Sequence, residues 1–160
     1  MSFRIGHGFD VHKFGGDKPL VLAGVHIPNA PGVLAHSDGD VVLHAVCDAL
    51  LGAAGLGDIG EHFPDTDETW KGANSRQLLA HVLSLLTQQK WQPMNVDVTV
   101  VAQTPRLSAQ KNRMRAQMAV DLNLPESAVN LKATTTEGLG YIGRKEGIAV
   151  HAVCMLKALE

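Results

Sequence analysis

The sequence predicts an α+β fold with two layers, in which helices pack on one face of a mainly four-stranded mixed sheet and an extra hairpin lies near the N-terminus. Two patterns indicate this class. Segments with the two-residue alternation of strands are interspersed with segments whose apolar residues recur at helical spacing. Strands and helices also alternate through the second half of the chain. A chain of 160 residues, 45% of them hydrophobic, can bury one core. We therefore expect a single domain over residues 1–160.

The N-terminal segment is predicted to form strands. The first covers Phe3–His12, where alternate side chains point to opposite faces. The face that carries Phe9 and Val11 is expected to meet the core. The apolar stretch Leu20–Pro28 is typical of a second strand, and Asn29–Gly32 of a turn. The extra hairpin is expected in this region.

The first helix is predicted over His36–Gly57, HSDGDVVLHAVCDALLGAAGLG. Ser37 is a suitable N-cap, and Asp40 three residues later completes a capping box. The glycines from Gly52 onward would end the helix. An irregular acidic loop, Asp58–Gly72, follows, and loops of this length often have a function.

The second half is predicted to alternate between helices and strands. Leucines and valines at helical spacing indicate one helix, and the methionines of another are expected to fill the core. The last two strands, joined by a glycine-rich segment, resemble a hairpin pair. The expected elements are a helix over Ser75–Gln89, a strand over Asn95–Gln103, a helix over Leu107–Leu122, and strands over Asn130–Thr135 and Ile148–Leu156.

Composition and charge exclude several classes of function. The net charge of −2 gives no reason to expect a nucleic-acid partner, and a solvated helix face explains the basic run between Arg106 and Arg115. No apolar run approaches the roughly 20 residues of a membrane span, so no membrane partner is expected. Cys47 and Cys154 lack metal-type or redox-type spacing and are expected to be buried free thiols. A bacterial cytoplasmic location follows, or a plastid after removal of a transit peptide.

The first strand and the first helix together offer a metal site. Asp10 and His12 share one face of the strand, and His44 lies about two turns into the helix. Zinc takes imidazole nitrogen and carboxylate oxygen, and a catalytic site has three protein ligands and one open position. The alternative is that His12 and His44 are separate histidines, and spacing alone leaves both open. His7 points to the other face and is expected to be structural.

Two further features of the helix have alternative interpretations. Asp48 lies one turn after His44 and is either an acceptor that orients its ring or a solvated carboxylate. The helix start at Ser37 is either an anion site, to which His36 would add a donor, or simply a well-capped helix.

A cluster of hydroxyls and a carboxylate follows one of the last strands, in ATTTEGLGYIGR, Ala133–Arg144. Hydroxyls and backbone amides bind phosphate oxygens, and Glu137 could hold Mg²⁺ or Mn²⁺ bridging them. The alternative is a threonine-rich strand with a polar turn, in which Arg144 and Glu146 form an ordinary surface pair.

Four motifs occur in order: GHGFDVH, AHSDGDVVLHAVCDALLGAAGLGDIGEHFPDTD, VDVTVVAQTPRL and KATTTEGLGYIGRKEGIA. Together they resemble the 2-C-methyl-D-erythritol 2,4-cyclodiphosphate synthases, from about Arg4 to the C-terminus. The resemblance implies a single catalytic domain and a phosphorus–oxygen lyase of the non-mevalonate pathway of isoprene biosynthesis. Such an enzyme converts 4-diphosphocytidyl-2-C-methyl-D-erythritol 2-phosphate to the cyclic diphosphate and releases CMP.

The resemblance also implies roles for particular residues. Zn²⁺ would bind to Asp10, His12 and His44, and a second ion, Mg²⁺ or Mn²⁺, to Glu137. His36 and Thr135 would take part in catalysis. The residues implied in substrate binding are His36, Ser37, Asp58, Gly60, Phe63, Pro64, Asp65, Thr66, Asp67, Ala102, Gln103, Thr104, Pro105, Arg106, Leu107, Thr134, Thr135, Thr136, Tyr141 and Arg144.

The family resemblance further implies a homotrimer with active sites between subunits. Asp58, Gly60 and the loop Phe63–Asp67 would line the methylerythritol end of the site, and residues 102–107 from a neighbouring subunit would close around the cytidine. A channel on the trimer axis could hold an isoprenoid diphosphate. Tyr141 stands where phenylalanine is more usual, Gly138 where a basic residue is common, and Arg106 where lysine is usual.

The implied reaction is an intramolecular phosphoryl transfer, in which the 2-phosphate oxygen attacks the β-phosphorus. The second pKa of a phosphate monoester is about 6, so the nucleophile is already ionised and no side chain need take its proton. Two other classes stay open. One is a metal-dependent phosphohydrolase that uses water at the same ion. The other is a non-catalytic trimer that binds an isoprenoid diphosphate, against which the intact metal ligands argue.

Overall fold

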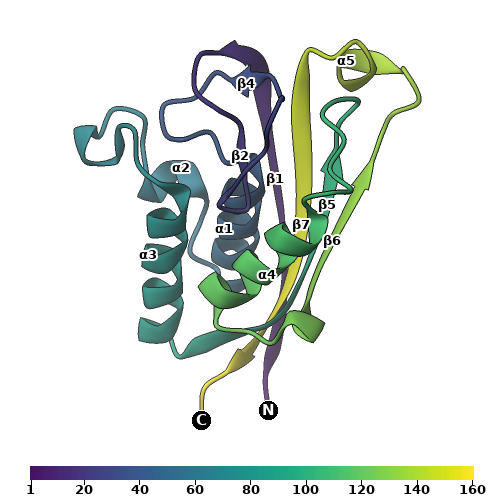
Figure 1. Cartoon of the computed structure of the whole chain (residues 1–160). Coiled ribbons are helices and arrows are strands. Elements are labelled where there is room, and N and C mark those ends of the chain that lie inside the picture. The colour runs from purple at the N-terminus through teal and green to yellow at the C-terminus, as the bar shows by residue number, and fades with distance from the viewer.

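A five-stranded mixed sheet forms one layer of the structure, a computed structural model that describes residues 1–160 (Figure 1). Its order is β4-β1-β7-β5-β6, with β7 antiparallel to both neighbours and β5 parallel to β6. Four long strands and one short edge strand confirm the predicted sheet. The strands are β1 (Phe3–Gly16), β4 (Gly32–Val33), β5 (Trp91–Val101), β6 (Val129–Thr134) and β7 (Gly147–Ala158).

Three longer helices form the second layer and cover one face of the sheet (Figure 1). The most buried is α1, which lies against β1 and β7 with fully buried side chains on most of its surface. The helices are α1 (Val41–Ala54), α3 (Ser75–Gln88) and α4 (Lys111–Leu122), with the short α2 (Ile59–His62) and α5 (Gly140–Gly143) and the 3₁₀ turns η1 (Glu68–Trp70) and η2 (Glu126–Ala128). The predicted two-layer arrangement is therefore confirmed.

Two glycines of β1 allow α1 to lie unusually close to the sheet. A Cβ atom at Gly6 would stand 1.9 Å from the carbonyl oxygen of Ala49, and one at Gly8 would stand 1.9 Å from that of Ala45. No side chain fits in that space, so the helix backbone packs directly on the strand. This close approach brings the middle of α1 beside the next residues of β1.

The predicted strand Leu20–Pro28 is instead a hairpin. Its two short strands, β2 (Val21–Leu22) and β3 (Val25–His26), pair with each other around Ala23 and Gly24. Both turn residues have positive φ, 54° and 75°, which the apolar pattern does not reveal. The single-strand prediction was wrong, whereas the extra N-terminal hairpin is present.

Helix α1 begins later than expected, and its N-cap is Asp40 rather than Ser37. The Asp40 carboxylate is completely buried and accepts a hydrogen bond from Leu43 N at 3.1 Å. It also accepts from the two N–H groups of the β2–β3 turn, at 2.9 and 2.7 Å. Three backbone donors favour Asp40 as the cap. A carboxylate thus occupies the helix start, which favours the well-capped helix over the anion site as the interpretation of this segment.

The face of β1 assigned to the core was also wrong. Phe9 and Val11 are 44% and 42% exposed, because the helices cover the side that carries the glycines and Asp10. We call the uncovered side of the sheet the open face. Its residues on β1 and β7 include Ile5, His7, Phe9, Val11, His151 and Val153.

The remaining elements are those expected, with differences in bounds and arrangement: β1 continues to Gly16, β5 begins at Trp91, and β4 was not predicted. The last two strands do not pair, because β5 lies between β6 and β7. The loop 58–72 contains α2 and η1, and α4 begins at Lys111 rather than Leu107. Cys47 and Cys154 are buried free thiols as expected. Each helix is too short or too polar to cross a lipid bilayer.

Candidate metal centre and substrate pockets

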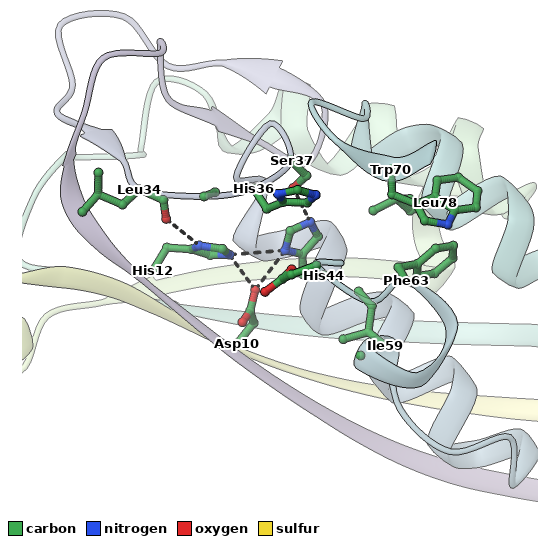
Figure 2. A pocket seen from close by; sticks show the side chains of 13 residues that line it. Asp10, His12, Leu34, His36, Ser37, His44, Ile59, Phe63, Trp70 and Leu78 are labelled. Carbon is green, nitrogen blue, oxygen red and sulfur yellow. Dashed lines mark hydrogen bonds and ion pairs between the residues drawn. The ribbon is translucent and has the colours of Figure 1, made fainter. Parts of the chain in front are cut away.

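Asp10, His12 and His44 converge on one point between β1 and α1 (Figure 2). Asp10 Oδ2 lies 2.9 Å from His12 Nε2 and 3.1 Å from His44 Nδ1, and the two nitrogens are 3.2 Å apart. In a tetrahedral shell with bonds of about 2.0–2.1 Å, zinc ligands lie about 3.3 Å from one another. The three atoms therefore fit a small divalent ion. They are the one group of three such ligands in the chain.

In each histidine ring, the nitrogen that faces away from Asp10 has a hydrogen-bond partner of its own. His12 Nδ1 lies 3.3 Å from the carbonyl oxygen of Leu34, which can only accept. His44 Nε2 lies 2.9 Å from Ser75 Oγ and 3.2 Å from Ser37 Oγ. Both rings are thus oriented with one nitrogen toward Asp10, as metal-binding histidines are in proteins.

The two histidines favour an ionised carboxylate at Asp10. Burial acts to raise the pKa of Asp10, but hydrogen bonds and charge from His12 and His44 outweigh it and lower this pKa to about 2. Burial acts to lower the pKa of His12, but its hydrogen bond with Asp10 outweighs that and raises it. The Asp10 carboxylate is therefore ionised and available to a cation, which would compete with a proton for His12.

Asp48 has a different role from both interpretations of the sequence. Its Oδ1 accepts a hydrogen bond from Ile59 N at 3.3 Å, so it anchors α2 rather than the His44 ring. The nearer partner of His44 Nε2 is Ser75, which sequence reasoning missed. Ser75 lies 31 residues away on another helix, and no local spacing rule connects the two.

A pocket of about 350 Å³ opens beside the triad (Figure 2). His36 lines it with a buried Nε2 that has no hydrogen-bond partner in the chain. Phe63 packs edge-on against Trp70 with ring centroids 4.8 Å apart, and this contact helps to fix the loop as an apolar wall. Of the sequence-predicted residues, the pocket contains Asp10, His12, His36, Ser37, His44, Gly60, Phe63 and Asp65, while Leu34, Ala35, Ile59, Trp70 and Leu78 were not predicted.

A second pocket of about 340 Å³ lies beside the ends of β5 and β6. It shares no residue with the first. Most of the residues implied in cytidine and phosphate binding gather there. They are Ala102, Gln103, Pro105, Arg106, Leu107, Thr134 and Thr135, together with the unpredicted Ser108 and Ala133.

The other predicted residues line neither pocket. Asp58 and Asp67 cap α2 and η1, accepting from backbone N–H groups at 2.9 Å in each case. Glu137 is exposed just beyond β6, with its N–H donated to Thr135 Oγ1 at 3.1 Å. Arg144 donates to Glu146 at 2.9 Å on the surface. Those outside both pockets are Asp58, Pro64, Thr66, Asp67, Thr104, Thr136, Glu137, Tyr141 and Arg144.

A family model described as the YgbB family matches residues 3–157. The chain belongs to the YgbB family. A 2-C-methyl-D-erythritol 2,4-cyclodiphosphate synthase of Shewanella denitrificans is 58% identical over 157 residues, which cover 98% of each chain. This confirms the resemblance inferred from the motifs, and it extends over nearly the whole chain.

Solved structures of YgbB-like proteins share the fold. The bifunctional IspDF of Campylobacter jejuni matches with a TM-score of 0.95 and 50% identity, over 99% of this chain and 43% of that one. The chain therefore spans less than half of that bifunctional protein. The IspF of Plasmodium falciparum, solved as a CDP complex, matches with a TM-score of 0.86 and 37% identity, over 99% of this chain and 97% of that one.

Proposed function

We propose that the chain is a metal-dependent phosphorus–oxygen lyase with one catalytic domain over residues 1–160. It converts 4-diphosphocytidyl-2-C-methyl-D-erythritol 2-phosphate to 2-C-methyl-D-erythritol 2,4-cyclodiphosphate and releases CMP, in the non-mevalonate pathway to isoprenoids. The observation that carries the proposal is the convergence of Asp10, His12 and His44 on a pocket, in a chain 58% identical to a synthase of that name.

Zn²⁺ is the ion that the triad fits best, since one carboxylate and two imidazoles leave one position open in a tetrahedral shell. When bound, it supplies a Lewis acid for a phosphate oxygen and a template for the substrate. Asp10 provides the negative charge that retains the ion. His12 and His44 provide nitrogens whose direction the surrounding acceptors determine.

The pocket residues bind and orient the substrate for an in-line attack. His36 Nε2, buried and unpartnered, is available to donate to a phosphate oxygen. The apolar wall of Ile59, Phe63 and Trp70 excludes water from the methylerythritol end. Because the attacking phosphate is already ionised at a second pKa of about 6, the task of the chain is orientation rather than proton removal.

The second pocket is proposed to bind the cytidine and its diphosphate, with Thr135 as a hydroxyl donor to phosphate. The CDP complex of the Plasmodium falciparum relative supports this. Glu137, beside Thr135, would hold Mg²⁺ or Mn²⁺ on the diphosphate. One substrate must reach both pockets, and they share no residue within the chain. We therefore propose that a neighbouring subunit contributes the second pocket.

A homotrimer formed through the open face meets this requirement. The face exposes apolar side chains on β1 and β7, with Ile5 70% and Val153 44% exposed. Contiguous apolar surface of this kind marks an interface. Val153→Lys should give monomers in sedimentation velocity and lose turnover, yet still bind zinc, because each triad lies within one chain. A wild-type chain that sediments as a monomer at assay concentration would contradict the trimer.

An isoprenoid diphosphate on the trimer axis is a second proposal. Leu139 and Tyr141 expose apolar surface beyond β6, and Arg144 supplies a cation, although Glu146 already pairs with it. Native mass spectrometry of the purified protein should reveal a bound polyprenyl diphosphate. Its absence after expression in cells that make such lipids would remove this proposal and leave the enzyme unaffected.

The reaction is tested by incubating the zinc-loaded protein with the cytidyl substrate and following the products by ³¹P NMR. Release of CMP with a cyclic diphosphate is expected. Release of free phosphate instead would identify a phosphohydrolase that uses water at the same ion. No turnover, with a polyprenyl diphosphate bound, would indicate a binding protein.

The variant Glu137→Gln tests whether the two proposed metal sites act independently. This variant keeps the size of the side chain and removes its charge, so turnover should fall while the zinc content stays at the wild-type value. Atomic emission spectroscopy measures the zinc. Loss of zinc in this variant would mean that the two metal roles are confused.

A further inference from the structure

A buried hydrogen-bonded chain holds His44 on the side of its ring away from Asp10 and His12. His44 Nε2 lies 2.9 Å from Ser75 Oγ. The Ser75 hydroxyl donates to Asp38 Oδ1, and the Ser75 N–H donates to Asp38 Oδ2 at 2.9 Å. Ser75 is the first residue of α3 and is completely buried, so these groups are its partners in place of water.

The direction of this chain determines which nitrogen of His44 carries a proton. A serine hydroxyl has one proton, and Ser75 donates it to the Asp38 carboxylate, which can only accept. Ser75 Oγ can therefore only accept from His44, so Nε2 must be the donor. The neutral imidazole has one N–H, which leaves a lone pair on Nδ1, the atom 3.1 Å from Asp10 Oδ2.

We propose that Asp38 and Ser75 are positioning residues that select the Nε2–H form of His44 and so direct the Nδ1 lone pair to the metal. This inference rests on the proposed zinc site. It assigns a role to an Asp–Ser pair in which the carboxylate acts on the ring through a hydroxyl. Charge-assisted hydrogen bonds are stronger than neutral ones, and neighbouring hydrogen bonds polarise one another, so the charge of Asp38 also strengthens the bond between Ser75 and His44.

Two neighbours compete with this arrangement. Ser37 Oγ lies 3.2 Å from the same nitrogen, and its own proton is free to be donated, since Oγ accepts only from Gly39 N–H. Asp10 attracts a proton to Nδ1. The contact with Ser75 is shorter than that with Ser37 and is the one connected to a carboxylate. Without Asp38, these competitors would favour the Nδ1–H form, which cannot bind a metal through Nδ1.

The decisive comparison is between Ser75→Ala and Asp38→Asn. Ser75→Ala removes the acceptor for Nε2. Asp38→Asn is nearly isosteric, but its amide can donate to Ser75 Oγ and free the hydroxyl to donate to Nε2, which selects the wrong form. Loss of an outer hydrogen-bond partner weakens metal binding about 10- to 100-fold. We expect Ser75→Ala to weaken zinc binding by a factor in that range, and Asp38→Asn to weaken it at least as much.

The experiment measures the zinc dissociation constant by competition with a chelator. In parallel, ¹H–¹⁵N NMR of the zinc-loaded, ¹⁵N-histidine-labelled protein observes the imidazole N–H groups. Ser75→Ala should accelerate solvent exchange of the His44 N–H and leave that of His12, which faces Leu34 O, unchanged as an internal reference. Ser84→Ala is the matched control, because Ser84 lies on the same helix and bonds only to His81 O. Its zinc affinity should equal that of the wild type.

Two results would overturn the inference. One is zinc affinity within about twofold of wild type, a change of about 0.4 kcal/mol, in both variants. The other is a cost for Asp38→Asn far smaller than for Ser75→Ala, which would indicate packing rather than proton direction. If the wild type binds no zinc, the proposed function fails. Long-range ¹H–¹⁵N couplings of His44 in the metal-free chain would then still decide between the Nε2–H and Nδ1–H forms.

Discussion

Strand β1 contributes one histidine to a pair on each side of the sheet, His12 beside His44 of α1 and His7 beside His151 of β7. On the side covered by helices, His12 Nε2 and His44 Nδ1 face each other at 3.2 Å. On the open face, His7 Nε2 and His151 Nδ1 face each other at 3.0 Å. The two pairs have the same residue type, nearly the same separation and one strand in common, so their difference lies in what surrounds them.

The covered pair has a carboxylate and the open pair does not. Asp10 Oδ2 lies within 3.1 Å of both nitrogens on the covered side, and each ring has its other nitrogen held by a fixed oxygen. On the open face, His151 also contacts the Phe9 ring, with centroids 4.9 Å apart. One imidazole there donates to the other, and no carboxylate joins the pair. Two neighbouring histidines are therefore not sufficient for a metal site. The imidazole nitrogens must also be oriented toward the position that a carboxylate oxygen faces.

The largest effect is expected for His44→Ala. Loss of a ligand should remove zinc and reduce turnover by more than the ~10- to 100-fold that an outer partner is worth. Zinc analysis and a CMP-release assay measure the two effects, and circular dichroism checks the fold. If the variant lacks zinc but keeps near-normal turnover, the pair of His12 and His44 has no metal-binding role in the reaction that the pair on the open face lacks.

The close approach of α1 to β1 is tested by Gly8→Ala. The added Cβ would lie 1.9 Å from Ala45 O, so the helix must move away and carry His44 with it. Thermal and urea unfolding should show a loss of about 3 kcal/mol, with weaker zinc binding.

Gly52→Ala is the matched control for this change. Gly52 lies on α1, the helix that Gly8 contacts, with nothing within 4 Å of its added Cβ. This variant should gain about 0.5–1 kcal/mol from helix propensity and keep its zinc. Equal stability and equal zinc affinity of Gly8→Ala and Gly52→Ala would show that the contact between Gly8 and α1 does not position the site.

A smaller effect is expected for Asp48→Ala. Removing the acceptor for Ile59 N should loosen α2, which lines the pocket, and raise KM a few-fold at a cost of about 1 kcal/mol. The zinc dissociation constant should not change. Asp48→Asn keeps an acceptor oxygen and should resemble the wild type. Weaker zinc binding in either variant would instead make Asp48 an orienting partner of His44.

The smallest effect is expected for His151→Gln on the open face. Glutamine can still hydrogen-bond to His7, and the triad lies on the other side of the sheet. The zinc dissociation constant, measured by chelator competition, should stay within about twofold of wild type, or 0.4 kcal/mol. A larger change would show that the two faces are coupled.

Local pattern was sufficient for most elements and for placing Asp10, His12 and His44 on them, whereas the structure brings these three side chains together. The alternation in β1 placed Asp10 and His12 together, and the helical period placed His44 within α1. Local pattern failed where a group distant in the sequence determines the structure, as at the N-cap of α1. Asp40 became the N-cap because the β2–β3 turn brought two more N–H donors to it, and no spacing rule reveals that turn.

The sequence by itself determined on which element each candidate ligand lies and that Asp10 and His12 share a face, because side-chain direction within a strand or helix follows from the backbone repeat. Only the tertiary structure decided which side of β1 is covered. The reason is steric, since the helix can approach only the side on which Gly6 and Gly8 leave space. The tertiary structure also decided that Ser75 and Asp38, rather than Asp48, hold His44. Those contacts join separate elements, and packing alone brings them together.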